Sequence, residues 1–368
     1  SAYVDGLQRM NVTNLVYTLN AIIGGTAVSI AAILGHGLPW LAALQTAVGA
    51  GTLVILILYA VRETRRRHGS VPLRLDLRQM RQSLRYGVAV LGSSVAHLSN
   101  LHFEKLLLGR YAGVEMASLW EIGLRSALAL RMLPSLLLSA IVPVVSHLSA
   151  TSRVPEVRRV YRRAMRYTSA LSLPLAAFAV IYMPSLLEMW IGDSCSPQMI
   201  WTARLLTLAH LGNVLLAVPL TLARGLGLVQ FEARTAAAHV LLQVVLGCAL
   251  VPLFGLRGAQ ASASITLLGI AGFGVVWMHR RMRLLEEPAG AFLGRHLTAP
   301  LVAAGFAVVA SLALRTVFAM QRTGAPDTLA SLFVAGLVFG VCYLAGFGAI
   351  SGLDAEERAL LTRPFRGW

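Results

Sequence analysis

Ten apolar runs of about 20 residues or more dominate this sequence, and most of its arginines lie in blocks between them. A membrane-spanning helix needs about 20 mostly apolar residues, because the hydrocarbon core of a bilayer is about 30 Å thick. Hydrophobic residues make up 57% of the chain and charged residues only 13%, whereas a soluble domain carries about a quarter charged residues. The sequence therefore predicts an all-α integral membrane protein with about ten transmembrane helices.

The predicted helices are placed to within a few residues. They cover residues 14–34, 40–61, 84–103, 114–148, 167–190, 199–222, 233–253, 258–279, 297–319 and 329–350. The fourth segment is long for one crossing, so it either projects past the bilayer or bends at Pro134 or Pro143, since proline interrupts helical hydrogen bonding.

The basic residues alternate along the chain in a way that predicts the topology. Loops on one side hold 24 of the 32 Lys and Arg residues, and loops on the other side hold three. Cytoplasmic loops are enriched in Lys and Arg, so both termini are predicted to lie in the cytoplasm. Because no basic face or stacking-aromatic pattern accompanies the net charge of +16, we expect no nucleic-acid binding.

Two of the cytoplasmic stretches are long. Residues 62–83 are interpreted as a linker between two helical bundles, or as a plain topogenic loop. Residues 153–166 contain paired arginines and are expected to form an amphipathic interfacial helix that touches anionic membrane lipids.

The three cysteines, Cys195, Cys248 and Cys342, lie far apart and lack the spacing of metal ligands. They predict neither a disulfide framework nor a metal site. We expect no metal and no cofactor.

Polar side chains inside the apolar segments are costly in hydrocarbon, so their placement is informative. Two segments carry a polar stripe with steps of three or four residues, which places its members on one helical face. The stripe of the third segment consists of Ser93, His97, Asn100 and Glu104. The stripe of the seventh segment consists of Glu232, Thr235 or Ala236, His239 and Gln243.

The fourth segment carries charges deep in the membrane. Glu121 and Arg125 are four residues apart and can pair on one helical face. Arg125 lies eleven residues into the segment, roughly 16 Å deep at ~1.5 Å per residue. A central Arg costs about 2.5–3.5 kcal/mol to insert, so we expect it to face a partner or a water-filled cavity. Arg131 points about 120° away from it.

One interpretation is that the third, fourth and seventh segments line a hydrated cavity. Its cations, Arg125 with Arg131 or Arg204, would attract an anionic head group, which the planar guanidinium of Arg suits. The alternative is that the neutral polar groups join helices, that Arg125 pairs only with Glu121, and that Arg204 snorkels from a segment end.

The remaining polar groups have other candidate roles. His97, His239 and His210 could relay protons or serve as hydrogen bonders in helix packing. Glu104 and Lys105, at the external end of the third segment, could form a weak interfacial ion pair.

The run from Glu104 to Gly113 resembles a recurring element of Wzx-like polysaccharide flippases. These are members of the multidrug/oligosaccharidyl-lipid/polysaccharide exporter superfamily. Further motifs follow in the family's order over residues 5–350: Leu119-Trp120 before Arg125, Leu133-Pro134, Ile141-Val142-Pro143, Trp190-Ile191-Gly192 and Gly255-Leu256-Arg257-Gly258-Ala259. Glu104 stands where the family more often has Asp, and Trp120 where it often has Tyr.

The resemblance implies two six-helix lobes followed by an added helix pair. The chain begins at Ser1 without Met, and the resemblance implies that the family's first four helices are absent. The implied parts are a remnant of the N-terminal lobe (1–62), a cytoplasmic linker (63–83), the C-terminal lobe (84–285), the added pair (286–350) and a cytoplasmic tail (351–368).

The resemblance also implies a function. A multi-pass protein of the bacterial cytoplasmic (inner) membrane would translocate polyprenyl-diphosphate-linked oligosaccharide by alternating access, with Arg125 and Arg131 as cavity cations and glycan polymerase machinery as a further partner. The alternatives are a cation-coupled small-molecule antiporter of the same superfamily, and a membrane glycan polymerase or ligase, which would need a larger external loop. We expect no enzymatic activity.

Overall fold

The computed structural model of the chain describes residues 10–68, 101–139, 141–150, 154–282, 288–321 and 329–351. These residues are almost entirely helical and include no strand. Among them, seven helices are long and apolar enough to cross a membrane, which confirms a multi-pass helical membrane protein. The chain divides into two compact units, Ser1–Tyr86 and Gly87–Trp368.

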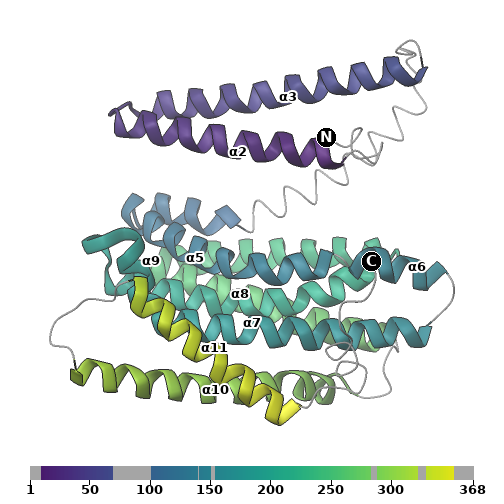
Figure 1. Cartoon of the computed structure of the whole chain (residues 1–368), viewed down its shortest axis with the longest axis vertical. Helices are drawn as coiled ribbons and strands as arrows, with labels where there is room; N and C mark the ends of the chain where they lie inside the picture. Colours follow the sequence, from purple (N-terminus) through teal and green to yellow (C-terminus); the bar gives the residue numbers. More distant parts are fainter. Residues whose placement is uncertain are drawn as a thin grey trace. The chain divides into compact units, whose positions relative to one another are not determined.

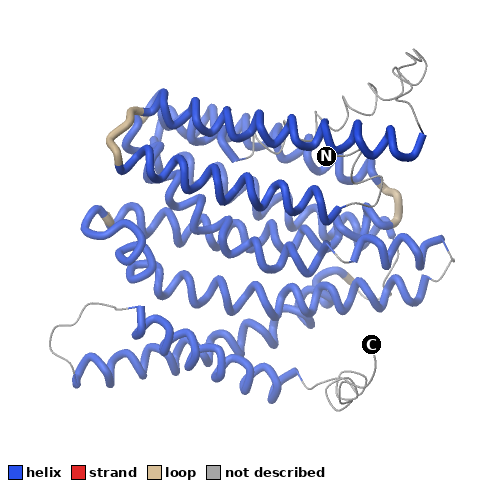
Figure 2. The backbone as a smooth tube through the Cα atoms, turned by 45° about the horizontal axis from the view of Figure 1, so that its top comes forward, coloured by secondary structure: helices blue, strands red, loops and turns tan. Residues whose placement is uncertain are grey.

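The first unit is a helical hairpin (Figures 1 and 2). Helices α2 (Met10–Ile33) and α3 (Leu38–His68) match the first two predicted segments. The turn between them contains Gly35 at a φ of 77°, a backbone conformation that favours glycine. Thr52 of α3 donates a hydrogen bond to Asn20 of α2 at 2.9 Å. Because α3 runs to His68, the first residues of the predicted linker are helical, and the rest lie outside the described residues.

Helix α8 (Pro197–Gly225) lies at the centre of the second unit. It packs against α5 (Val114–Ser139), α6 (Ile141–Ala150), α7 (Val154–Ile191) and α9 (Val229–Met282). Its N-terminus is capped by Ser196, whose side chain accepts a hydrogen bond from the backbone of Met199 at 3.2 Å, and Pro197 occupies the first turn, where a missing N–H costs nothing. This central helix holds the surrounding helices in one bundle.

The long fourth predicted segment is helical in the part that the structure describes. Helix α5 ends at Ser139 and α6 begins at Ile141. Pro134 lies inside α5, and Pro143 lies near the start of α6. Residue 140 lies outside the described residues, so whether this segment bends or projects past the bilayer stays a prediction.

Helix α9 contains the seventh and eighth predicted segments folded back on each other. Its backbone is non-helical at Gly255, where φ is 54°, and a Cβ atom on Gly258 would overlap the carbonyl of Leu250. Near the other end, the rings of Phe231 and Trp277 stack with centroids 4.6 Å apart. These contacts make α9 an antiparallel hairpin.

Helix α7 differs from the prediction at its N-terminal end. Residues 154–166 are helical, as expected, but they continue directly into the apolar part of a 38-residue helix. Their apolar side chains, Val157, Tyr161 and Met165, are buried in a cluster with Val145 of α6 and Phe292 of α10. The predicted helix is therefore present, but protein covers its apolar face, and contact of its arginines with anionic lipid stays a prediction.

Helices α10 (Ala289–Gln321) and α11 (Leu329–Ser351) pack on each other and on α7 (Figure 1). Tyr182 of α7 and Ser311 of α10 share a buried hydrogen bond. The hydroxyl of Tyr343 on α11 donates to the backbone carbonyl of Ala170 on α7 at 2.7 Å. This carbonyl lacks its usual helical donor because the residue four positions on is Pro174.

Candidate functional site

A chain of three charged side chains connects α5 with the helix over 101–111. The Glu121 carboxylate accepts from Lys105 at 3.1 Å through one oxygen and from Arg125 at 2.8 Å through the other. Glu121 is 20% exposed, Lys105 40% and Arg125 66%. Two cations therefore share one carboxylate, and this charged network carries one net positive charge. The predicted pairing of Glu121 with Arg125 is confirmed, while Lys105 is a partner that helical spacing alone did not indicate.

Glu104 and Gln243 form a buried pair beside this network. The Gln243 amide donates to one Glu104 carboxylate oxygen at 2.6 Å, and Glu104 is only 1% exposed. Its other carboxylate oxygen is buried without a hydrogen-bond partner among the described residues. The predicted Glu104–Lys105 ion pair is wrong, since neighbouring helix residues point about 100° apart and Lys105 reaches Glu121 instead.

Arg131, His210 and His239 come together from α5, α8 and α9. His210 is buried, its Nδ1 lies 2.9 Å from the Leu206 carbonyl oxygen, and Arg131 and His239 lie near it. The structure thus brings two of the predicted cavity residues, Arg131 and His239, to the same histidine.

Glu232 was predicted to belong to the polar stripe of the seventh segment, but it contacts Arg224 instead. It forms a two-contact ion pair with Arg224, and the Arg224 Nε–Glu232 Oε2 distance is 2.7 Å. This ion pair connects the end of α8 with the start of α9 and lies apart from the Glu104–Gln243 pair.

Arg204 forms a hydrogen bond to another helix that its position in the sequence did not predict. Its Nε donates to the backbone carbonyl of Val180 on α7 at 2.7 Å. That carbonyl lacks its helical donor because Pro184 stands four residues on. Arg204 therefore satisfies a backbone acceptor on α7, and it has no contact with the charged network among the described residues.

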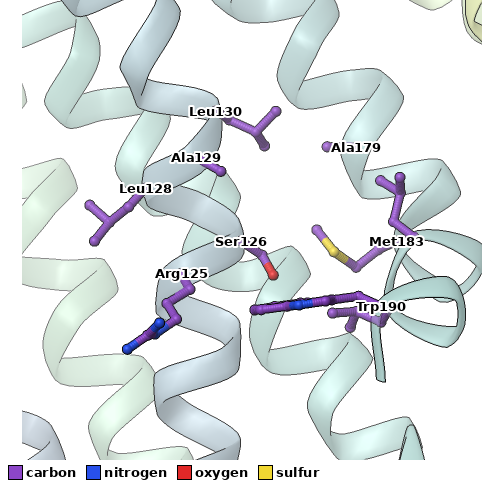
Figure 3. A pocket seen from close by; sticks show the side chains of 10 residues that line it. Arg125, Ser126, Leu128, Ala129, Leu130, Ala179, Met183 and Trp190 are labelled. Atoms are coloured by element: carbon purple, nitrogen blue, oxygen red, sulfur yellow. The ribbon is translucent and has the colours of Figure 1, made fainter. Parts of the chain in front are cut away.

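An apolar pocket lies between α5 and α7 beside Arg125 (Figure 3). Its volume is about 620 Å³. Ser126, Ala129, Ala179, Met183 and Trp190 are among its lining residues. Figure 3 shows the Arg125 guanidinium pointing away from the Trp190 ring, so Arg125 contributes its stem to the pocket. The pocket suits an apolar chain whose charged end would lie outside it.

Two predicted site residues, His97 and Asn100, lie outside the described residues. Among the residues that the structure does describe, no group of three or more His, Cys, Asp and Glu side chains could hold a metal ion.

The apolar helices of the described residues define a multi-pass helical membrane protein. A family model described as polysaccharide biosynthesis protein matches residues 8–199, just over half of the chain. The chain belongs to this family of polysaccharide biosynthesis proteins. The matched region contains the whole Lys105–Glu121–Arg125 network as well as Glu104 and Arg131. A comparison with curated proteins finds no match.

Proposed function

We propose that this protein takes part in translocating a polyprenyl-diphosphate-linked oligosaccharide across the bacterial cytoplasmic membrane. The observation that carries this proposal is the position of Arg125, a cation with a 66% exposed side chain beside an apolar pocket of about 620 Å³. The substrate has the matching chemistry, since an anionic diphosphate joins an apolar isoprenoid chain to a polar glycan.

The Arg125 guanidinium has the orientation and the unused N–H donors to bind a phosphate oxygen. Its Nε–H is already used by Glu121, which fixes the plane of the guanidinium and leaves the four other N–H donors for a ligand. Planar donors of this kind contact phosphate bidentately. The charged network has one net positive charge, so it would attract a diphosphate. The affinity would still be low enough for the diphosphate to dissociate.

Arg131 provides a second cationic position. It lies six residues beyond Arg125 on α5, about 9 Å along the helix axis, next to His210 and His239. In alternating access, the diphosphate would pass from one arginine toward the other as the lobes rock. Both positions keep the anion near a cation while the glycan crosses.

The test is Arg125→Ala, with Arg125→Lys beside it, in cells that depend on this protein for glycan export. Charge-assisted hydrogen bonds contribute about 1.5–3 kcal/mol, so Ala should lower export at least tenfold, while Lys should retain part of it. Arg110→Ala is the matched control, because Arg110 is exposed at the end of the neighbouring helix and lies outside the network. Unchanged export by Arg125→Ala at equal membrane levels would refute the role of Arg125.

The buried carboxylate of Glu104 supports a second candidate, a cation-coupled small-molecule antiporter. A carboxylate that is 1% exposed with one unbonded oxygen is suited to taking up a proton or a cation. Measuring lipid-linked glycan export and cation-driven drug efflux in the same cells separates the two functions.

A further inference from the structure

A second pocket lies where α7, α8 and α10 meet, and its volume is about 460 Å³. Helix α8 contributes Trp201, Arg204, Leu205 and Leu208, which are spaced along one helical face. Ile181 of α7 and Leu312 of α10 complete the walls. Trp201, Leu208 and Leu312 are all exposed on the surface of the bundle, so the pocket opens toward the surrounding lipid.

The charge of Arg204 is not neutralised by any acidic side chain among the described residues. Its contact there is the 2.7 Å hydrogen bond from Nε to the Val180 carbonyl, which uses one of five N–H donors. The four remaining donors belong to the two terminal nitrogens. An uncompensated arginine at a lipid-facing surface is costly, and a bound anion would remove that cost.

Trp201 indicates where the membrane interface lies relative to Arg204. Trp201 lies one turn nearer the end of α8, and exposed tryptophans concentrate at the membrane–water interface. Arg204 is three residues further on, about 4.5 Å deeper. The hydrogen bond to Val180 holds the guanidinium against the bundle, close to the interface at which lipid head groups lie.

The α10 wall of the pocket is held in place. Ser311 shares a buried hydrogen bond with Tyr182, and these residues are the chain neighbours of Leu312 and Ile181. The bond therefore fixes the apolar wall beside Arg204. A ligand that reaches Arg204 would lay an apolar chain against Leu205, Leu208 and Leu312.

We propose that this pocket binds an anionic glycerophospholipid, with its phosphodiester on Arg204 and one acyl chain along the leucine side of the pocket. A phosphodiester carries a single negative charge and so matches a single guanidinium. The site is separate from Arg125 and does not depend on the proposed translocation. The bound lipid would connect α10 to the central bundle.

The test uses the full chain purified in detergent, with native mass spectrometry and thermal unfolding in the presence of phosphatidylglycerol or phosphatidylcholine with identical acyl chains. The wild type should bind phosphatidylglycerol about tenfold more tightly than phosphatidylcholine, as expected for one charge-assisted contact. Arg204→Gln should abolish this preference. Arg110→Gln removes an exposed arginine elsewhere and should leave it intact.

Two further variants separate lipid binding from the structural role of Arg204. In the double variant Pro184→Ala/Arg204→Gln, the new amide N–H can satisfy Val180 while the charge is absent, so the chain should fold but show no phosphatidylglycerol preference. Leu208→Trp keeps Arg204 and fills the pocket, and should weaken binding of both lipids. A preference for phosphatidylglycerol that persists in the double variant would overturn the proposal. So would stabilisation of the wild type by inorganic phosphate equal to that by phosphatidylglycerol.

Discussion

Single residues of α7 show how proline shapes the contacts of this protein. Pro174 and Pro184 each leave the carbonyl four residues earlier without its helical donor. In both places a side chain from another helix supplies the donor: Tyr343 reaches Ala170 and Arg204 reaches Val180. Hydrocarbon offers no water to satisfy such a carbonyl, so each proline creates a specific docking point for a neighbouring helix.

The docking role of Pro174 predicts a result for Tyr343→Phe. The substitution removes only the hydroxyl and should lower the free energy of unfolding by about 0.6–1.7 kcal/mol, the range for hydrogen bonds between membrane helices. In a Pro174→Ala background the backbone N–H can serve Ala170, so the same substitution should cost close to nothing. Unfolding of the purified chain in mixed micelles measures both values. Equal costs in the two backgrounds would show that Pro174 has no part in this contact.

At the scale of whole helices, close approach between α5 and α8 depends on the absence of a side chain. A Cβ atom on Gly123 would lie 3.0 Å from the Thr202 Cγ2 atom and 3.2 Å from the backbone nitrogen of Ala203. Membrane helices gain little from burying apolar groups against each other, because lipid is equally apolar, so small residues that allow tight packing matter more. Gly123 therefore sets the distance between α5, which carries the charged network, and the central helix.

Gly123→Leu is expected to push α5 away from α8 and lower the free energy of unfolding by about 1–3 kcal/mol, as overpacking does. Gly272→Leu is the matched control, because Gly272 is an exposed helical glycine with open space around its Cβ position. That variant should be neutral or slightly stabilised, since glycine is a poor helix former. Thermal unfolding in detergent compares the two, and an equal response would argue against tight packing at Gly123.

At the scale of the whole molecule, the chain consists of two compact units, and the boundary at residues 86 and 87 lies close to the start of the lobe predicted from the resemblance. The assignment of these units to lobes and the side of the membrane on which each loop lies remain predictions. The turn between α7 and α8 offers a natural probe of topology, because Cys195 lies in it as a free thiol.

Cys195 should react from outside intact cells with a charged, membrane-impermeant methanethiosulfonate in a Cys248→Ser/Cys342→Ser background. A cysteine introduced as Arg159→Cys, together with Cys195→Ser, should react only after permeabilisation, because residue 159 lies in the arginine-rich stretch predicted to be cytoplasmic. The opposite pattern would invert the topology.

The same reaction should depend on pH in a defined direction. Burial and the nearby Glu188 carboxylate raise the pKa of the Cys195 thiol, and the thiolate is the reactive form. The labelling rate should therefore be low near pH 7 and rise about tenfold per pH unit until the pH reaches that raised pKa. A rate independent of pH between 7 and 9 would contradict the raised pKa.

Local patterns were sufficient to predict some of these features. The helical positions follow from apolar runs, since each run must cover the hydrocarbon thickness. The Glu121–Arg125 pair follows from a four-residue spacing, because such residues are neighbours on any α-helix. Both properties depend only on residues that are close together in the sequence, so the sequence alone is sufficient to predict them.

Only the tertiary structure decided which distant residues meet. Gln243 is 139 positions from Glu104, and Ser311 is 129 positions from Tyr182; helical periodicity indicates a face but not the helix that covers it. The extension of α7 to Val154 and the anchoring of Arg204 depend in the same way on neighbouring helices. The sequence by itself determined a multi-pass helical membrane protein with charged residues inside its apolar segments, and helix packing determined which of those charges pair.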